Sequence, residues 1–461
     1  MKRLMWIVVT WLSGAVAIAI ANPRDPGVRQ QASDNSPPAG LTGLAQDELA
    51  YFEDGLARFE TVEVVNGAGI GQGNGLGPRF NSDSCVSCHA QPNPGGSSPA
   101  QNPLLTIATA YGAANNIPWF IAADGPVREA RFVQSNGTAD GGVHKLFVVS
   151  GRSDAGSCAL IQPSFGPPGD PVSGQGGNPN VIFRIPTPLF GAGLIEAIPD
   201  SAILANKGAN ASLKTELGIK GHPNAHISGT ANTSANDGTI TRFGWKAQNK
   251  SLLLFAAEAY NVEMGVTNEL FPQERDETPG CVFNPTPEDA LNFSATPNTA
   301  VLSDIEAFAN FMRMLAPPAP APDTPSIVSG RATFAAVGCA ACHTPTLRTA
   351  KMIASGSSTV PSAALADTPV NLYSDLLLHH MGERLDDGIV QGQAATDEFR
   401  TAPLWGIGQR VFFLHDGRTT DLVEAIEAHR SRGSEATEVV SRFNQLDPAA
   451  QQDLVNFLRS L

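Results

Sequence analysis

Beyond its first 21 residues the chain has no long apolar run, and positive charge is scarce throughout. The 461 residues include 30 lysines and arginines against 44 aspartates and glutamates, a formal net charge of −14 at pH 7. Crossing a bilayer takes about 20 consecutive apolar residues, and binding to nucleic acid depends on basic side chains. The composition therefore excludes a membrane span in the mature chain and argues against a nucleic-acid partner.

Cysteine is also scarce, and four of the six cysteines form two copies of one motif. Two cysteines three apart, followed at once by a histidine, occur at residues 85–89 and 339–343. A structural zinc site would need a second nearby ligand pair, which neither copy has. The pattern is instead typical of covalent haem attachment, with the histidine as an axial ligand of the iron. We therefore expect two covalently bound haem c groups, held by Cys85, Cys88 and His89 and by Cys339, Cys342 and His343.

Residues 1–21 have the features of a signal peptide. Lys2 and Arg3 give a charged start, an apolar run follows, and Ala19-Ile20-Ala21 fits a cleavage site between small residues. The alternative is an uncleaved membrane anchor. Cleavage would export the protein, to the periplasm in a Gram-negative host.

The remaining two cysteines are Cys158 and Cys281. An even remainder in an oxidising compartment suggests one disulfide bond, and two separate buried thiols are the alternative.

The length and the internal organisation favour two domains. Residues 22–44 are rich in Pro, Gly, Ser and Gln and are interpreted as a flexible tether, and the Pro-rich run 317–325 separates the halves. Each half holds one haem motif, and segment 183–193 resembles segment 399–408. We expect a mainly α fold of two cytochrome c-like domains, 45–320 and 325–461, with long loops and a few short strands.

Apolar spacing predicts the individual elements. Helices are expected at 46–59, 252–264, 303–315, 422–429 and 447–461. The Gly-, Pro- and Asn-rich region 91–180 should contain long loops, with short strands around 117–122 and 146–150.

At this point the sequence resembles the bacterial di-haem cytochrome c peroxidase and MauG superfamily, and more closely its di-haem oxidoreductase, or thiol oxidoreductase-like, branch. The resemblance covers about residues 45–461. It is carried by the two haem motifs and by Gly244-Trp245-Lys-Ala, Val262-Glu263-Met264-Gly265, Tyr373 to His379 and Phe413-Leu-His415-Asp-Gly-Arg418.

The resemblance implies a role for each matching residue. His89 would be the proximal ligand of a peroxide-reactive haem, and Glu263 the distal acid-base carboxylate. Trp245 would stand between the two haems. His343 would ligate an electron-transfer haem, with His429 as its second axial ligand. Relatives often also bind calcium between their domains.

Two departures weaken the expectation of efficient hydrogen peroxide turnover. Peroxidase relatives usually carry a glutamine two to three turns before the glutamate, where this chain has Leu252 to Phe255. The loop before it has Gly-Trp-Lys-Ala in place of Trp-Asp-Gly-Arg.

Several side chains have competing interpretations. Met264 or Tyr260 could close the first haem as a ligand, or pack in the core. His379, His380 and Met381 could reach a haem or its propionate, or be solvated. The alternatives for the other candidates are a surface position or ion pair for Glu263, aromatic packing for Trp245, a helix C-terminus for His429 and loop ordering for His415.

The sequence thus predicts an exported, periplasmic di-haem oxidoreductase of peroxidase type. Peroxide would react at the His89 haem, and electrons would arrive through the His343 haem from a small cytochrome or cupredoxin. The alternatives are MauG-like oxidation of a protein partner and a non-catalytic electron-transfer cytochrome with both irons six-coordinate.

Overall fold

The computed structural model describes residues 22–29, 38–66, 72–110, 117–148, 160–169, 177–225, 240–273, 287–289, 302–351 and 362–461. The proposed signal peptide 1–21, Cys158 and Cys281 lie outside these ranges, so the cleavage and the disulfide bond stay predictions. None of the helices in these ranges is long and apolar enough to cross a membrane.

Helices dominate this part of the chain, which confirms the mainly α class. They are α1 Gln46–Phe59, α2 Cys85–Cys88, α3 Leu104–Ala110, α4 Ala192–Glu196, α5 Asp200–Gly208, α6 Ala211–Leu217, α7 Leu252–Met264, α8 Asp304–Met314, α9 Pro325–Val337, α10 Leu422–Ala428, α11 Thr437–Asn444 and α12 Pro448–Ser460. The five helices expected from apolar spacing are present within about one residue. Two short 3₁₀ helices are also present, at Cys339–Ala341 and Ile407–Gln409.

The strands are short and pair in small sheets. The pairs are β1 Val62–Val64 with β2 Gln72–Asn74, β3 Arg79–Phe80 with β8 Phe147–Val148, β5 Gln134–Ser135 with β6 Thr138–Ala139, β10 Leu347–Arg348 with β11 Pro369–Val370, and β12 Leu378–His380 with β13 Glu398–Arg400. In a three-stranded sheet, β4 Glu129–Phe132 lies between β7 Val143–His144 and β9 Val181–Arg184.

The strand expected at 117–122 is wrong. The segment forms a turn in which the Ile121 N–H bonds the Pro118 carbonyl. Its apolar residues are explained by burial, because Phe120 packs on Phe183 with ring centroids 4.5 Å apart. The strand expected around 146–150 is present as β8, although residues 149 and 150 are outside the described ranges.

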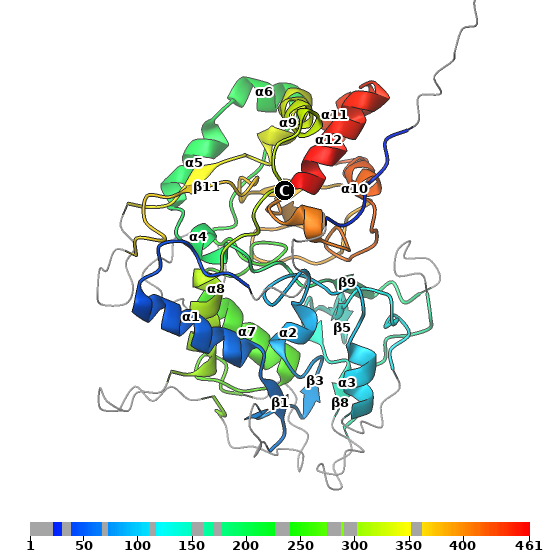
Figure 1. Ribbon diagram of the computed structural model, residues 1–461. Coiled ribbons are helices and arrows are strands. Elements are labelled where there is room, and N and C mark those ends of the chain that lie inside the picture. Colours follow the sequence, from blue (N-terminus) through cyan, green and yellow to red (C-terminus); the bar gives the residue numbers. More distant parts are fainter. Residues whose placement is uncertain are drawn as a thin grey trace, which may run out of the picture.

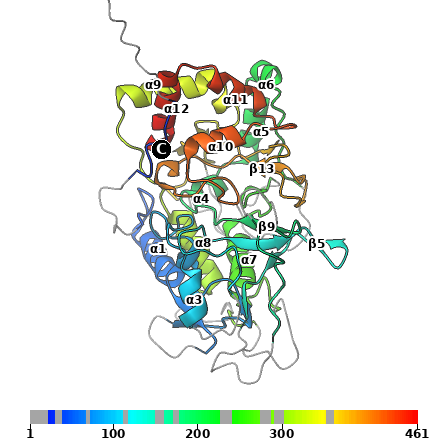
Figure 2. The ribbon, with the colours of Figure 1, turned by 90° about the vertical axis from the view of Figure 1, so that its right-hand side faces the viewer.

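Two groups of helices lie at opposite ends of the molecule (Figures 1 and 2). One contains α1, α7 and α8, and the other α9 to α12. In the first group Gly55 lets α1 approach α8 closely, because a side chain there would meet the carbonyl of Ala307. In the second, Gly330 plays the same part between α9 and the main chain at Asp453 of α12.

Two segments cross the boundary suggested by the Pro-rich run. Leu217 at the end of α6 lies in the same apolar cluster as Phe334 of α9, and α5 and α6 lie beside the second helix group in Figure 1. Residues 22–29, part of the expected tether, lie along the second group as well, where Asp25 pairs with Arg459 at 2.6 Å.

Buried charges join strand and loop segments that lie outside both helix groups. The Lys246 ammonium donates to three main-chain carbonyls of residues 395–398 at 2.8–2.9 Å and lies 3.2 Å from Asp387. Its side chain is 0% exposed. Asp387 also pairs with Arg184 of β9 at 2.6 Å. A single ammonium therefore fixes the loop before β13 against the segment that carries Trp245.

Replacing Lys246 should weaken the fold, because the buried carbonyl oxygen of Glu398 would lose its donor and the buried carboxylate of Asp387 would lose one of its charge partners. With about 1–3 kcal/mol for each unsatisfied group, we expect Lys246→Met to lower the free energy of unfolding of the haem-loaded protein by about 2 kcal/mol or more. Urea denaturation measures this. The exposed Lys207 provides the control, since Lys207→Met should stay within about 0.5 kcal/mol of the wild type. Equal midpoints for the two variants would contradict this account.

Candidate functional site

The first haem motif opens onto a cavity in the first helix group. Cys85 and Cys88 begin and end the single turn of α2, and His89 follows directly. All three line the cavity, whose empty space of about 1120 Å³ is partly open to solvent. Its walls are mostly apolar, as a porphyrin requires.

His89 has the orientation of a metal ligand. Its Nδ1 lies 3.0 Å from the carbonyl oxygen of Gly96. A carbonyl only accepts hydrogen bonds, so Nδ1 carries the ring proton and Nε2 keeps its lone pair. Burial lowers the pKa of His89 to about 4, which keeps the imidazole neutral. A carbonyl that accepts the proton of the other ring nitrogen in this way is typical of metal-bound histidine.

Two carboxyl groups meet in the same cavity. Glu263, near the end of α7, forms a hydrogen bond with Glu129 of β4. Asn81 donates to Glu263 Oε2 at 2.7 Å, and Arg131 holds Glu129 Oε1 at 2.6 Å. The four side chains form one hydrogen-bonded chain at the cavity wall.

The environment gives the two carboxyl groups opposite charge states. Burial, followed by the charge of Glu129, raises the pKa of Glu263 to about 8. Burial acts in the same sense on Glu129, but Arg131 and the hydrogen bond from Glu263 outweigh it and lower the pKa of Glu129. At neutral pH the pair therefore holds one proton, on Glu263, beside an ionised Glu129. Two carboxyl groups in contact commonly share a proton in this way.

The competing ligands for the first cavity are both buried. The Tyr260 hydroxyl lies 3.0 Å from Glu63 and 3.1 Å from Asp304, so it is engaged by carboxyl groups. Met264 is 3% exposed and belongs to the apolar core. Both side chains line the cavity.

The second haem motif opens onto a cavity between α9, α10 and α12. Cys339, Cys342 and His343 line an apolar space of about 1440 Å³. His343 Nδ1 lies 3.0 Å from the carbonyl oxygen of Tyr373, which again leaves Nε2 available. Burial, followed by the proximity of His429, lowers the pKa of His343 to about 4.

His429 lines this same cavity at the C-terminal end of α10. Its Nδ1 lies 2.7 Å from the carbonyl oxygen of Ala425 one turn earlier, and burial lowers its pKa. The ring is therefore neutral, and its Nε2 keeps a lone pair that can bind a metal. The structure thus brings His343 and His429, two matching imidazoles, into one cavity.

The other histidines near the second cavity are engaged differently. Both nitrogens of His379 contact carboxylates, Glu435 at 2.7 Å and Asp375 at 3.0 Å, and its pKa is raised well above the usual value despite burial. A protonated ring held at both nitrogens has no lone pair for iron. His415 is neutral because burial lowers its pKa to about 4, and its ring stacks on Phe399 at 4.4 Å.

Trp245 lines both cavities. Its indole is 9% exposed and donates from Nε1 to the carbonyl oxygen of Ile185 at 2.8 Å. The main-chain N–H of Arg400 binds the Trp245 carbonyl oxygen at 2.9 Å. Trp245 is thus held through its ring by the segment that follows β9 and through its main chain by β13, and no other tryptophan of the described residues lines both spaces.

An unpaired charge in the second cavity supports an acidic macrocycle there. Arg410 lines this cavity, and its Nε and Nη2 atoms are buried with no partner among the described residues. Such groups are costly unless an anion pairs with them. A haem propionate is an anion that could pair with Arg410. The cysteine thiols would attach the haem, and the imidazoles would bind its iron. The residues of both cavities therefore fit haem.

Sequence reasoning missed Glu129, Arg131 and Arg410. The first two lie in a region interpreted mostly as loop, although the acid-x-base pattern Glu129-Ala-Arg131 places both on one face of a strand. Arg410 carries no motif, and only its unpaired state in the folded chain reveals it.

Comparison with known proteins places the chain in a family. A family profile described as "Di-haem oxidoreductase, putative peroxidase" matches residues 178–461. The match includes Trp245, Glu263, the second haem motif and His429, but not the first motif. No curated protein matches the chain.

Several solved structures share a distant likeness. Hydrazine synthase from Kuenenia stuttgartiensis is 17% identical, covering 36% of this chain and 57% of its own, with a TM-score of 0.22. The diheme peroxidase BthA from Burkholderia thailandensis is 16% identical, with coverages of 48% and 65% and a TM-score of 0.28. A MauG-like protein associated with microbial copper homeostasis is 13% identical, with coverages of 51% and 78% and a TM-score of 0.30.

This chain thus spans only 57% and 65% of the first two structures, and TM-scores below 0.5 carry no argument about function. The assignment rests on the family profile, which extends over more than half of the sequence. By that match the chain belongs to the di-haem oxidoreductase family.

Proposed function

We propose that this protein, whose family implies two haem groups, is a peroxidase-type oxidoreductase that reduces peroxide at the His89 haem with electrons from the His343 haem. The observation that carries the proposal is that Trp245 lines both cavities, each of which contains a complete Cys-x-x-Cys-His motif. In the proposal each cavity belongs to a cytochrome c-like domain, and both haems are attached covalently as haem c.

The two cavities differ in a way that suits different tasks. The second offers paired imidazoles, His343 and His429, which suit a six-coordinate haem that only carries electrons. The first offers one neutral imidazole, His89, and the Glu129–Glu263 pair. A haem held there would supply an iron with an open position for peroxide. Ligation by Met264 or Tyr260 would instead close it.

The carboxyl pair supplies what heterolytic cleavage of a peroxide bond needs from the protein. One oxygen must lose a proton and the leaving oxygen must gain one. Ionised Glu129 accepts a proton, and protonated Glu263 donates one. Asn81 and Arg131 orient the pair. Trp245, with an oxidisable indole between the cavities, would shorten the path of the electron.

Location and partners complete the proposal. Cleavage of the predicted signal peptide would place the protein in the periplasm, where a small cytochrome or cupredoxin would deliver electrons to the acidic surface. The family resemblance also implies calcium between the domains, and calcium takes six to eight oxygen ligands. Three carbonyl oxygens of residues 395–398 are not available to such an ion, because they already accept hydrogen bonds from Lys246. Calcium between the domains would have to use other oxygen atoms.

Optical spectra of the purified protein test the proposed function. The ferric form, or the form with the second haem reduced, should show one high-spin haem that shifts with peroxide or cyanide and one low-spin haem that does not. Two low-spin haems that ignore both ligands in every redox state would identify an electron-transfer cytochrome instead. A high-spin haem without peroxide consumption would favour oxidation of a protein partner.

Glu263→Gln removes the donated proton while keeping the shape of the side chain. We expect peroxide turnover to fall by about 100-fold or more, since positioned acid-base groups contribute about 10²–10⁴-fold. Steady-state turnover with a reduced cytochrome as donor measures this, with haem content as the check on folding. Glu258→Gln on the same helix is the matched control, because Glu258 does not line the first cavity. Equal rates for both variants would remove Glu263 from the mechanism.

The carboxyl pair also predicts a pH limb. The pKa of Glu263 is raised to about 8, so its proton is present below that pH and lost above it. The kcat/KM for peroxide should therefore fall as pH rises through about 8. In Glu129→Gln burial still raises this pKa, but the contribution of the Glu129 charge is gone, so the limb should move to lower pH. A limb at the same pH in both proteins would point to another group.

His429→Gly tests the second axial ligand. Without the imidazole the second haem should change from low-spin to high-spin, which absorption and electron paramagnetic resonance spectra detect. His415→Gln is the control in the same cavity and should leave that haem low-spin. The opposite pattern would transfer the role to His415, and no change in either variant would point to a ligand outside this pair.

A further inference from the structure

Beside the first haem cavity lies another space, which we name the outer cavity. It is lined by parts of β4, β7 and α7, by residues 270–273 beyond α7 and by residues 390 and 391. A volume of about 680 Å³ in it is open to the centres of water-sized molecules. Sites for small organic ligands have volumes of about 300–1000 Å³. The outer cavity is therefore large enough for an organic molecule.

The Glu129–Glu263 pair belongs to the wall between this cavity and the first haem cavity. Six residues line both spaces: Glu129, Arg131, Gln248, Phe255, Ala259 and Glu263. The Glu129 side chain is 19% exposed although it lines the haem cavity. A molecule in the outer cavity can therefore contact the carboxyl pair that serves the first haem in the proposed function.

Much of the outer cavity is lined by apolar side chains. Those beyond the shared wall are Val143, Val262, Leu270, Phe271, Pro272 and Val390. Val143 is 5% exposed and Val390 is 64% exposed, so the apolar lining extends from the interior to the surface. Phe255 adds an aromatic ring on the shared wall. An apolar group gains free energy when it leaves water for such a surface.

The charges on these walls disfavour anions. Among the described residues that line the outer cavity, Arg131 is the one basic side chain. It is already engaged, because it pairs with Glu129 at 2.6 Å and donates to the carbonyl oxygen of Gly141 at 2.6 Å. Asp140 adds a further carboxylate. Since like charges repel, an uncharged ligand suits this cavity better than one that carries its own carboxylate.

We propose, on the basis of the proposed peroxidase function, that the outer cavity binds the organic group of an uncharged hydroperoxide, ROOH. The hydroperoxyl end would then reach the Glu129–Glu263 pair on the shared wall. The O–O bond breaks as two electrons arrive from the donor protein and two protons are taken up, which gives the alcohol ROH and one water molecule. The proposal thus names the class of peroxide that this site accepts.

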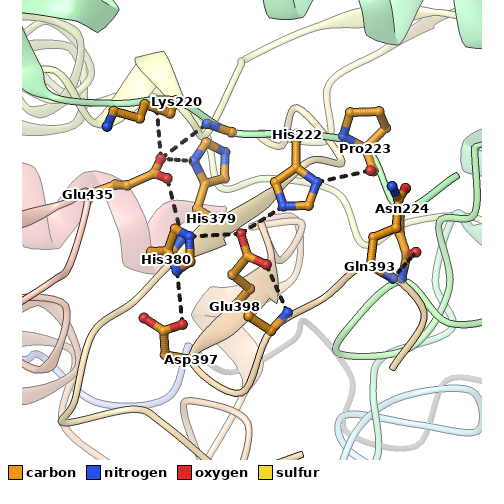
Figure 3. Close-up of polar contacts among 12 residues, drawn as sticks. Lys220, His222, Pro223, Asn224, His379, His380, Gln393, Asp397, Glu398 and Glu435 are labelled. Atoms are coloured by element: carbon orange, nitrogen blue, oxygen red, sulfur yellow. Dashed lines mark hydrogen bonds and ion pairs between the residues drawn. The ribbon is translucent and has the colours of Figure 1, made fainter. Parts of the chain in front are cut away.

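The rim of the outer cavity at Val390 is held in place by neighbouring segments. Asn224 Oδ1 accepts the main-chain N–H of Gln393 at 3.0 Å (Figure 3), and Asn224 Nδ2 donates to the carbonyl oxygen of Gln391 at 3.0 Å. The Gln391 side chain also accepts from Arg184 at 2.6 Å. A larger side chain at position 390 would therefore stay at the rim, which makes this position suitable for a test.

Steady-state turnover of the haem-loaded protein tests the substrate class. Hydrogen peroxide, cumene hydroperoxide and a ring-carboxylated cumene hydroperoxide are compared, with a reduced cytochrome as the donor. We expect kcat/KM for cumene hydroperoxide to exceed that of each of the other two by about tenfold, as for other apolar pockets. A preference for hydrogen peroxide, or equal values for the neutral and carboxylated compounds, would overturn this inference alone. Turnover of none of the three would also overturn the proposed function.

Matched tryptophan variants locate the binding site. Val390 does not line the first haem cavity, so Val390→Trp should lower kcat/KM for cumene hydroperoxide about tenfold more than for hydrogen peroxide. Val328→Trp is the control and should change neither value, because Val328 is 50% exposed on α9 and lines neither cavity. Equal effects of Val390→Trp on both peroxides would contradict an organic binding site.

A binding measurement without turnover completes the test. Cumyl alcohol, the product of cumene hydroperoxide, is titrated calorimetrically into the haem-loaded proteins. It should bind the wild type and Val328→Trp with equal affinity and Val390→Trp about tenfold more weakly. Unchanged haem spectra check that the variants fold. Equal affinity in the two tryptophan variants, or no binding to the wild type, would overturn the inference and leave the peroxidase reaction at the first haem standing.

Discussion

The placement of one indole between two apolar cavities is the constraint on which the rest of the site depends. Trp245 is fixed by its own Nε1–H bond to Ile185 and by the Arg400 N–H on its carbonyl oxygen. The next residue, Lys246, then inserts its ammonium among the carbonyls of residues 395–398. Because the ammonium is buried, it cannot be released without leaving polar groups unsatisfied. The distance between the two cavities is therefore set by the fold and does not depend on side-chain mobility at the surface.

The two cavities on either side of Trp245 orient their imidazoles in the same way but differ in their other polar groups. His89, His343 and His429 each give Nδ1–H to a main-chain carbonyl and keep Nε2 free. The first cavity adds a carboxyl pair that holds one proton, and the second adds an opposing imidazole and the unpaired Arg410. In the proposed function, proton transfer is therefore confined to the first cavity, and the second carries electrons alone.

The sequence was sufficient for the features that repeat or that follow from periodicity. The five amphipathic helices and the two attachment motifs could be predicted because each is encoded within a short stretch. The cavity that joins His343 to His429 also followed, through the family resemblance. The contact of Glu129 with Glu263 could not be predicted, because it forms only when β4 pairs with β9 and lies beside α7. The strand prediction at 117–122 was wrong because a buried turn can have the same apolar composition as a short strand.

The contacts between residues near the two ends of the sequence constrain the order in which the chain can fold. Asp25 and Arg459 are 434 residues apart and form two hydrogen bonds, and the main-chain N–H of Arg29 bonds Gly408 in the same region. The entropy of closing a loop grows with its length, so this is among the costliest contacts to form early. It can form only after the residues between them, which include both Cys-x-x-Cys-His motifs, have been synthesised. Docking of this early segment on α12 would therefore follow the emergence of both motifs.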